Sequence, residues 1–170
     1  MWRQAASIWS VDDLIAAGDF LVHPRTGLVT IEDLRDEIAE AGDIRGRLKR
    51  ALLEIREGAE SAQETVLRLA ITRAGLPEPE LNWELRDENG RFVARLDLAY
   101  PQFRVASEYD GRHHADEQQF RTDADRWDDI RAQDWNLVRV LSHHLRPDPR
   151  IAVEKVASAL IAAGWRPGRA

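Results

Sequence analysis

The first third of the chain repeats its apolar residues with the spacing of α-helices. Ser10 precedes such a stretch and is followed by two acids, so we predict a capped helix over residues 10–22. Thr30 and Asp33 have the spacing of a capping box, which predicts the start of a second helix. A third helix is expected over about residues 45–57.

After Gly58 the helical spacing gives way to shorter segments that alternate in type. Ser61 and Glu64 have the S-x-x-E spacing that opens a helix. The elements expected here are a helix at 61–75, strands at 80–87, 91–100 and 103–110, a helix at 116–133, a strand at 136–141 and a helix at 148–165. This order, α-β-β-β-α-β-α, predicts an α/β (α+β) fold for residues 58–170, preceded by a helical segment of residues 1–57.

Two tight turns set the predicted pairing of the first three strands. Asn89-Gly90 predicts a type I′ hairpin turn, and Pro101-Gln102 is expected to form a two-residue loop. With that loop, Asp97 would pair with Ala106. Asp97 and Glu108 would then be diagonal neighbours on one face, with Cα atoms about 7–8 Å apart.

The span from residue 95 to residue 114 holds three acids and two histidines among apolar residues: Asp97, Glu108, Asp110, His113 and His114. Like charges this close resist ionising together, and a divalent cation removes that penalty. Oxygen ligands suit Mg²⁺ or Mn²⁺, so the spacing favours a metal site at Asp97 and Glu108. The alternative is the exposed face of an antiparallel sheet, where scattered acids are ordinary.

The net charge and the lack of cysteine limit which ligands and partners the chain is expected to bind. The net charge of −6 disfavours a protein whose whole surface binds nucleic acid, although the segment 45–56 is locally basic. Its Arg47, Lys49 and Arg50 form either a solvated helix face or a nucleic-acid contact. The chain has no cysteine, which excludes disulfides and thiolate metal sites.

The sequence gives no sign of a membrane segment or a secretory signal. No apolar run approaches the roughly 20 residues that span a bilayer, so no membrane partner is expected. The start of the chain lacks a basic region followed by an apolar one, and we therefore expect a cytoplasmic location.

Four motifs together carry a family resemblance: GAESAQETVLR (58–68), RLDLAYP (95–101), VASEYDGRHH (105–114) and WNLVRV (135–140). They resemble the PD-(D/E)XK nuclease superfamily, and within it a family of small bacterial proteins related to very-short-patch repair endonucleases. The resemblance covers about residues 58–145. It implies a restriction-endonuclease-like core and a metal-dependent endonuclease that hydrolyses phosphodiester bonds, with DNA as the expected partner.

The resemblance also implies roles for single residues. Asp97 and Glu108 match the acids that hold Mg²⁺ or Mn²⁺. Glu64 matches a helix glutamate that orients a metal-bound water, beside its capping-box interpretation. His114 matches a histidine suited to act as general base. Arg126, with Asp123, matches a charged pair that supports the site or contacts a phosphate.

Three residues depart from the expected pattern. Asp110 stands at the superfamily's lysine position and cannot supply a positive charge beside the scissile phosphate. This substitution departs from the superfamily but is usual in the family that the chain resembles. Asp134 stands where a glycine usually precedes the tryptophan. Ser107 occupies a strand position that is usually apolar.

These departures keep other functions open. One alternative is a nuclease-fold module of reduced or lost activity that binds nucleic acid or protein, such as a toxin–antitoxin-like partner. Homodimerisation through the N-terminal helices is a further expectation. A transition-metal site formed by His113-His114 and His143-His144 is disfavoured, because adjacent residues on a strand point to opposite faces.

Overall fold

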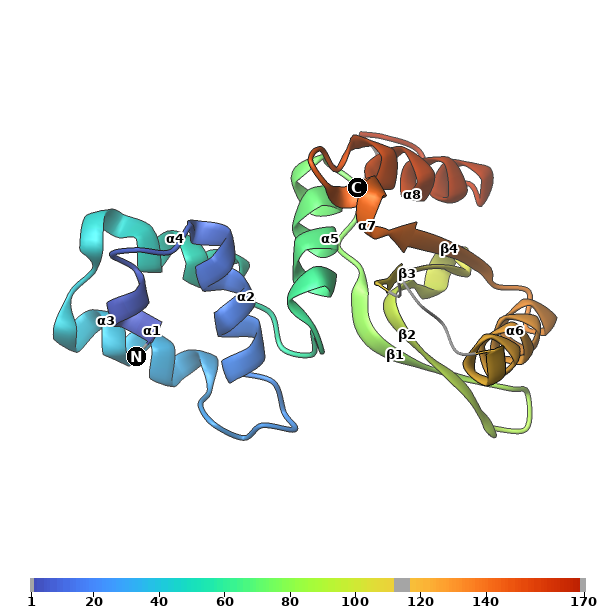
Figure 1. Cartoon of the computed structure of the whole chain (residues 1–170), viewed down its shortest axis with the longest axis horizontal. Coiled ribbons are helices and arrows are strands. Elements are labelled where there is room, and N and C mark those ends of the chain that lie inside the picture. The colour runs from blue at the N-terminus through green and yellow to red at the C-terminus, as the bar shows by residue number, and fades with distance from the viewer. Residues whose placement is uncertain (1, 112–116, 169–170) are drawn as a thin grey trace. The chain divides into compact units, whose positions relative to one another are not determined.

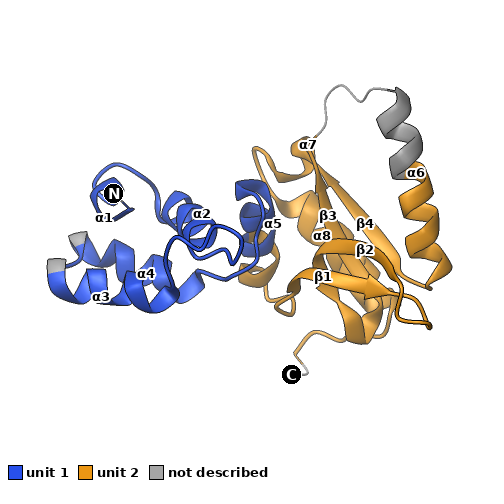
Figure 2. Cartoon of the chain, turned by 90° about the horizontal axis from the view of Figure 1, so that it is seen from below, with its two compact units in different colours: residues 1–69 blue, residues 70–170 orange. Residues whose placement is uncertain are grey.

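The structure is a computed structural model that describes residues 2–111 and 117–168, without the side chains of residues 41, 44 and 117–123. Its residues fall into two compact units, 1–69 and 70–170 (Figure 2), and the division lies inside one helix. The domain boundary expected after residue 57 stays a prediction. Each unit is considered by itself below.

The first unit is helical. Its elements are α1 (Trp2–Ala5), α2 (Val11–Leu21), α3 (Ile31–Ala41), the 3₁₀ turn η1 (Ile44–Gly46), α4 (Arg47–Glu54) and the first part of α5 (Ala62–Arg73). The predicted Ser10 cap and the predicted Thr30–Asp33 capping box are both confirmed, and Ser10 also forms a capping box with Asp13 at the start of α2. The apolar faces of these helices meet in one core that includes Leu14.

The third predicted helix, 45–57, is wrong at both ends. Arg45 has a φ of 57°, which breaks the helical path before α4 begins. Asp43 then supplies the start of α4, because its carboxylate accepts hydrogen bonds from the backbone N–H groups of Leu48 (2.9 Å) and Lys49 (3.1 Å). The basic segment is therefore a short helix that an upstream acid caps.

The second unit contains a four-stranded mixed sheet (Figure 1). Its elements are β1 (Glu80–Arg86), β2 (Phe92–Tyr100), the 3₁₀ turn η2 (Pro101–Phe103), β3 (Val105–Asp110), α6 (Glu117–Ala132), β4 (Asn136–Leu141), α7 (Ser142–Leu145) and α8 (Arg150–Ala162). The sheet order is β1-β2-β3-β4, with antiparallel pairing up to β3 and a parallel β3–β4 pair. The predicted α/β class is confirmed, and the order of elements follows the prediction except for the short helix α7, which lies between β4 and α8.

The β1–β2 hairpin pairs Glu84 with Arg95, but its turn differs from the predicted type. A type I′ turn needs positive φ at both central residues, and only Gly90 has it (78°). Asp87 closes the turn instead, because its side chain accepts hydrogen bonds from the backbone N–H groups of Asn89 and Arg91, each at 2.9 Å.

The predicted β2–β3 register is also wrong. Pro101 opens the 3₁₀ turn η2, and Arg104 follows with a φ of 50°, so the loop has four residues instead of two. Ala106 consequently pairs with Ala99, where Asp97 was expected. This longer loop moves β3 two residues along β2 and keeps every side chain on its predicted face.

Helices cover the sheet on two sides. Helix α6 packs against β2 and β4, whereas α8 packs against β3 and β4, and Figure 1 shows the sheet between these helices. On the α6 side, Ile130 packs with Ala99 and Ala106 in one buried cluster. The small alanines allow α6 to approach the middle strands, and polar side chains on the same face lie beyond this cluster.

Among the helices of the described ranges, none combines the length and the apolar character that a bilayer crossing requires.

Candidate active site

The two acids of the predicted metal site lie on the β2–β3 pair. The β2–β3 ladder ends with Leu98 paired to Ser107, and the same register continued by one residue would set Asp97 opposite Glu108. Both residues lie on the sheet face that α6 covers. The Asp97 carboxylate also accepts a hydrogen bond from the backbone N–H of Tyr109 (3.3 Å). The two acids therefore share one face of the β2–β3 pair, as predicted, with a register that differs from the predicted one by two residues.

Glu108 is nearly buried, with 8% of its surface exposed, and its carboxylate is paired with Arg126 of α6. One guanidinium nitrogen donates to Oε2 at 2.9 Å and the other donates to Oε1. The second nitrogen also donates to the backbone carbonyl of Arg95, at 2.7 Å. This two-pronged arrangement is the strong form of a carboxylate–arginine pair, and it neutralises a charge that burial would otherwise penalise.

Asp110 forms a second carboxylate–arginine pair at the edge of the same face. Its partner is Arg139 of β4, which stands beside Glu108 in the parallel pairing of β3 and β4. The guanidinium carbon of Arg139 also lies 3.8 Å from the ring centroid of Trp127 on α6, a cation–π geometry. Among the described residues, no acceptor contacts the buried Nε atom of Arg139.

Arg139 lies in the motif WNLVRV, yet the sequence did not predict a role for this residue. The sequence does contain an indication of such a role, because Arg139 is the one charged residue in the apolar strand NLVRVL. A charge in such a strand needs a partner on its own face of the sheet. Asp110 is that partner, two residues beyond Glu108.

The other predicted site residues are not among the described residues of the second unit. Glu64, Arg47, Lys49 and Arg50 belong to the first unit, and the described residues do not include His114. The site that the structure assembles in the second unit therefore consists of Asp97, Glu108, Asp110 and Arg126 from the prediction, with Arg139 and Trp127 added.

Glu64 acts at the start of α5. Its carboxylate accepts a hydrogen bond from the backbone N–H of Glu60 (2.8 Å), and its own N–H donates to the side chain of Ser61 (3.2 Å). Burial raises the pKa of Glu64 above its usual value, although these hydrogen bonds oppose the shift. The predicted capping role is confirmed, and the proposed water-orienting role stays a prediction.

The basic helix α4 faces its own unit with its apolar side. Leu48 and Ala51 are fully buried, whereas Lys49 and Arg50 are exposed. Arg47 donates a hydrogen bond to the backbone carbonyl of Trp9 and so contributes to the fold of this unit. A solvated helix face accounts for this arrangement, and contact with nucleic acid stays a prediction.

The described residues contain no group of three or more His, Asp or Glu side chains arranged to hold a metal ion. Asp97 and Glu108 form a two-carboxylate arrangement, which Mg²⁺ commonly uses together with water ligands. The donor set fits such an ion if Arg126 releases at least one oxygen of Glu108.

His143 and His144 lie in α7 with ring centroids 4.1 Å apart. The Nδ1 atom of His144 accepts a hydrogen bond from the backbone N–H of Leu141 (3.0 Å), which occupies one possible metal-binding nitrogen. Desolvation lowers the pKa of His144, and the nearby charge of Lys155 adds to this effect. The hydrogen bond between Leu141 and His144 links the end of β4 to the short helix α7.

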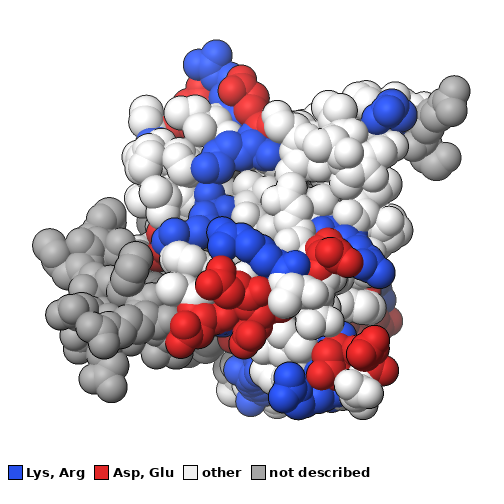
Figure 3. Space-filling model, turned by 90° about the vertical axis from the view of Figure 1, so that its right-hand side faces the viewer, with Lys and Arg blue, Asp and Glu red and all other residues white. Residues whose placement is uncertain are grey.

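One face of the molecule carries basic and acidic side chains close to each other (Figure 3). Figure 3 shows a band of Lys and Arg side chains beside a group of Asp and Glu side chains. Such a border between the two signs can hold a cation and a phosphate next to each other.

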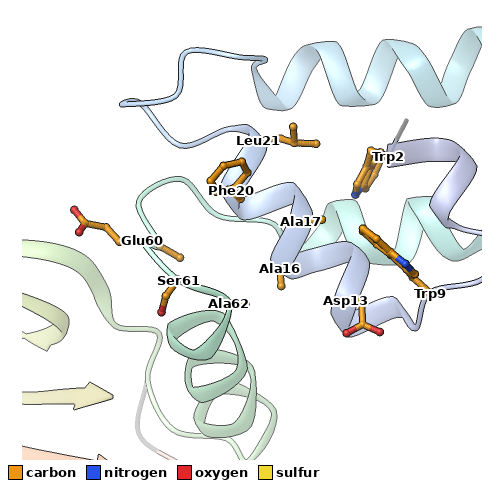
Figure 4. Close-up of a pocket in the computed structure, with 11 residues that line it drawn as sticks. Trp2, Trp9, Asp13, Ala16, Ala17, Phe20, Leu21, Glu60, Ser61 and Ala62 are labelled. Carbon is orange, nitrogen blue, oxygen red and sulfur yellow. The ribbon is translucent and has the colours of Figure 1, made fainter. Parts of the chain in front are cut away.

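The first unit contains a separate cavity of about 840 Å³. Figure 4 shows the indoles of Trp2 and Trp9 beside the helix that carries Phe20 and Leu21. Asp13 supplies an acid at this largely apolar lining. None of the residues that the sequence predicted as functional lines this cavity.

Comparison with known proteins gives distant relatives. The chain is 31% identical over 131 residues to two uncharacterized proteins of Mycobacterium tuberculosis, MT2308 of strain CDC 1551 / Oshkosh and Rv2248 of strain H37Rv. The aligned region is 75% of this chain and 48% of each relative, so the chain spans about half the length of the curated relatives it matches. No protein-family model matches the chain, and no solved structure matches it significantly.

Proposed function

We propose that residues 58–170 form a restriction-endonuclease-like nuclease domain that hydrolyses phosphodiester bonds in DNA with the help of a divalent cation. The observation that supports this proposal best is that Asp97 and Glu108 share one face of adjacent antiparallel strands, where the Asp97 carboxylate accepts a hydrogen bond from the backbone N–H of Tyr109, the residue after Glu108. The four sequence motifs that resemble PD-(D/E)XK nucleases supply the reaction class.

In this proposal Asp97 and Glu108 hold Mg²⁺ or Mn²⁺. The ion supplies an activated water and neutralises charge on the phosphate. His114 accepts the proton of the attacking water, and Glu64 keeps the water-orienting role that the resemblance implies. The remaining requirement is a positive charge near the scissile phosphate.

Arg139 is the best candidate for that positive charge. Asp110 occupies the usual lysine position, and the Arg139 guanidinium lies against Asp110 from the neighbouring strand. The Arg139 side chain is 41% exposed, so a phosphate can reach it, while Trp127 and Asp110 restrict its movement. A guanidinium also suits two-pronged contact with phosphate oxygens.

The direct test is a nicking assay on plasmid DNA and on RNA, with Mn²⁺ or Mg²⁺ and with chelator. We expect cleavage by the wild-type protein that needs the metal and is lost in Asp97→Asn. A matched control is Glu84→Gln, which removes an exposed acid from the neighbouring strand β1. Equal cleavage by the wild type and Asp97→Asn would contradict the proposal.

One observation favours a second candidate, a non-catalytic module of the same fold. The Arg126 guanidinium already supplies a cation to Glu108, which can stabilise this face without any metal. Such a module would bind nucleic acid or a protein partner, including a toxin–antitoxin-like partner or a second copy through the N-terminal helices. A wild-type protein that neither gains stability from Mn²⁺ nor cleaves nucleic acid would favour this candidate, and a size measurement in solution would test the second copy.

A further inference from the structure

We propose that Arg126 is an internal counter-ion that competes with the divalent cation for the Glu108 carboxylate, and that a phosphodiester displaces it. The inference rests on the proposed function, because it concerns the regulation of the same site. It assigns Arg126 two alternative partners: Glu108 in the free protein and a phosphate in the complex with nucleic acid.

The geometry leaves little of the Glu108 carboxylate available to an ion. Both oxygens accept hydrogen bonds from Arg126, and the backbone carbonyl of Arg95 fixes the same guanidinium. Mg²⁺ contacts its oxygen ligands directly, at about 2.1 Å, and needs the lone pairs that Arg126 now occupies. A guanidinium and a divalent ion on one carboxylate also repel each other.

Arg126 is placed so that it can leave. Its side chain is 31% exposed, so its charged end can pass into solvent without crossing the core. Release of the guanidinium would leave the buried Glu108 uncompensated, and a divalent cation held with Asp97 restores the balance of charge. The exchange therefore substitutes one cation for another at the same carboxylate.

The released guanidinium remains close to the metal position. Phosphate oxygens are good acceptors for both prongs of an arginine, so a bound phosphodiester holds Arg126 away from Glu108. Metal binding and nucleic-acid binding then strengthen each other through one side chain. This coupling is reciprocal, as any equilibrium linkage must be.

The test compares Mn²⁺ binding by wild-type protein, Arg126→Gln and Arg131→Gln, using calorimetric titration of the full chain. Arg131 is the matched control, since it is an exposed arginine on the same helix that pairs with Asp128. We expect Arg126→Gln to bind Mn²⁺ at least about tenfold more tightly than the wild type, because no competitor has to leave first. Arg131→Gln should bind like the wild type.

A second variant separates the two-pronged contact from the charge. Arg126→Lys keeps a positive charge but cannot occupy both carboxylate oxygens with a planar fork, so its Mn²⁺ affinity should lie between those of the wild type and Arg126→Gln. This variant also serves if Arg126→Gln does not fold in the absence of metal. A short phosphodiester oligonucleotide should tighten Mn²⁺ binding by the wild type by a larger factor than it does for Arg126→Gln, because only the wild type has Arg126 to displace.

The outcomes separate this inference from the proposed function. If the wild type binds Mn²⁺ and neither Arg126 variant binds it more tightly, the counter-ion role is wrong and the metal site remains. If none of the proteins binds Mn²⁺, the metal site is wrong and the inference falls with it. Binding by Arg126→Gln alone would support the competition most strongly.

Discussion

Each unit of the molecule contains an arginine that neutralises a buried carboxylate, and the two pairs differ in access. In the first unit Arg68 pairs with Asp19 at 2.8 Å, and each side chain is only 1% exposed. In the second unit Arg126 pairs with Glu108, and these side chains are 31% and 11% exposed. The chemistry is the same, but solvent reaches only the second pair.

The hydrogen bonds around Asp19 show that its buried carboxylate has a structural role in the first unit. Its carboxylate also accepts hydrogen bonds from the hydroxyl of Thr65 (2.8 Å) and the backbone N–H of Arg56 (2.7 Å). Arg68 donates in addition to the carbonyl of Glu54 (2.8 Å). This network ties α2 to α5 and to the end of α4, and it leaves no route for another ion. An enclosed pair of this kind fixes a fold, whereas an open pair can exchange its partner.

The largest expected effect comes from breaking the enclosed pair. Asp19→Asn should lower the free energy of unfolding by about 3–5 kcal/mol, because Arg68 is left as a buried charge without a carboxylate. Chemical denaturation measures the loss. Mn²⁺ should not alter it, and a loss below about 1 kcal/mol would show that the enclosed pair contributes far less than its burial indicates.

The next effect concerns Arg139, the second arginine of the open face. Arg139→Gln should slow DNA cleavage on the order of 100-fold, because it removes the charge proposed to face the phosphate. The control is Arg104→Gln, which disrupts an exposed pair with Asp134 in the same unit. Cleavage at the wild-type rate by Arg139→Gln would return this residue to a purely structural role.

Breaking the open pair should cost less than breaking the enclosed one. Glu108→Gln is expected to lower the free energy of unfolding by about 1–2 kcal/mol, since Arg126 can turn its charge to solvent. The same change should abolish stabilisation by Mn²⁺. A loss as large as that of Asp19→Asn would contradict the distinction between the two pairs.

The smallest effect is expected at Glu64, a buried acid whose carboxylate is held by a backbone N–H. Because burial raises its folded-state pKa above the ordinary value of 4.5, its ionisation opposes folding. The stability that Glu64 contributes is therefore complete below pH 4.5 and is lost as the pH rises through the folded-state pKa. Glu64→Gln should be slightly more stable than the wild type at pH 7.

Thermal melts of both proteins from pH 4 to pH 8 test the behaviour of Glu64. The advantage of Glu64→Gln should disappear in acid, where the wild-type carboxyl is protonated. An advantage that grows in acid would mean that the ionised carboxylate stabilises the start of α5.

Local signals in the sequence were sufficient for much of the fold. Ser10 and Thr30 cap their helices as predicted because a cap depends on residues within one turn. The four strands lie within two residues of their predicted ends, since alternation and turn residues mark them. The shared face of Asp97 and Glu108 was predictable for the same reason, as a shift of two residues preserves side-chain direction.

The strand register and the partners of the buried charges depend on contacts between distant parts of the chain, which the local sequence pattern does not indicate. The register of β3 follows from the turn at Pro101 and from the positive φ of Arg104. Arginine has no preference for positive φ, so the sequence does not indicate this conformation. Asp134 adopts a φ of 59°, which explains why a glycine suits this position. The partners of Arg126 and Arg139 come from distant segments, so only the assembled sheet shows them.

The central claim is that Asp97 and Glu108 together hold a divalent cation. The most direct measurement is the shift in melting temperature that Mn²⁺ produces in the wild-type protein and in Asp97→Asn. A ligand that binds only the folded state raises the melting temperature, so the wild type should melt higher with Mn²⁺. Asp97→Asn should fold as well as the wild type without metal and show no shift with it. A wild-type protein that Mn²⁺ does not stabilise, or equal shifts in both proteins, would contradict the claim.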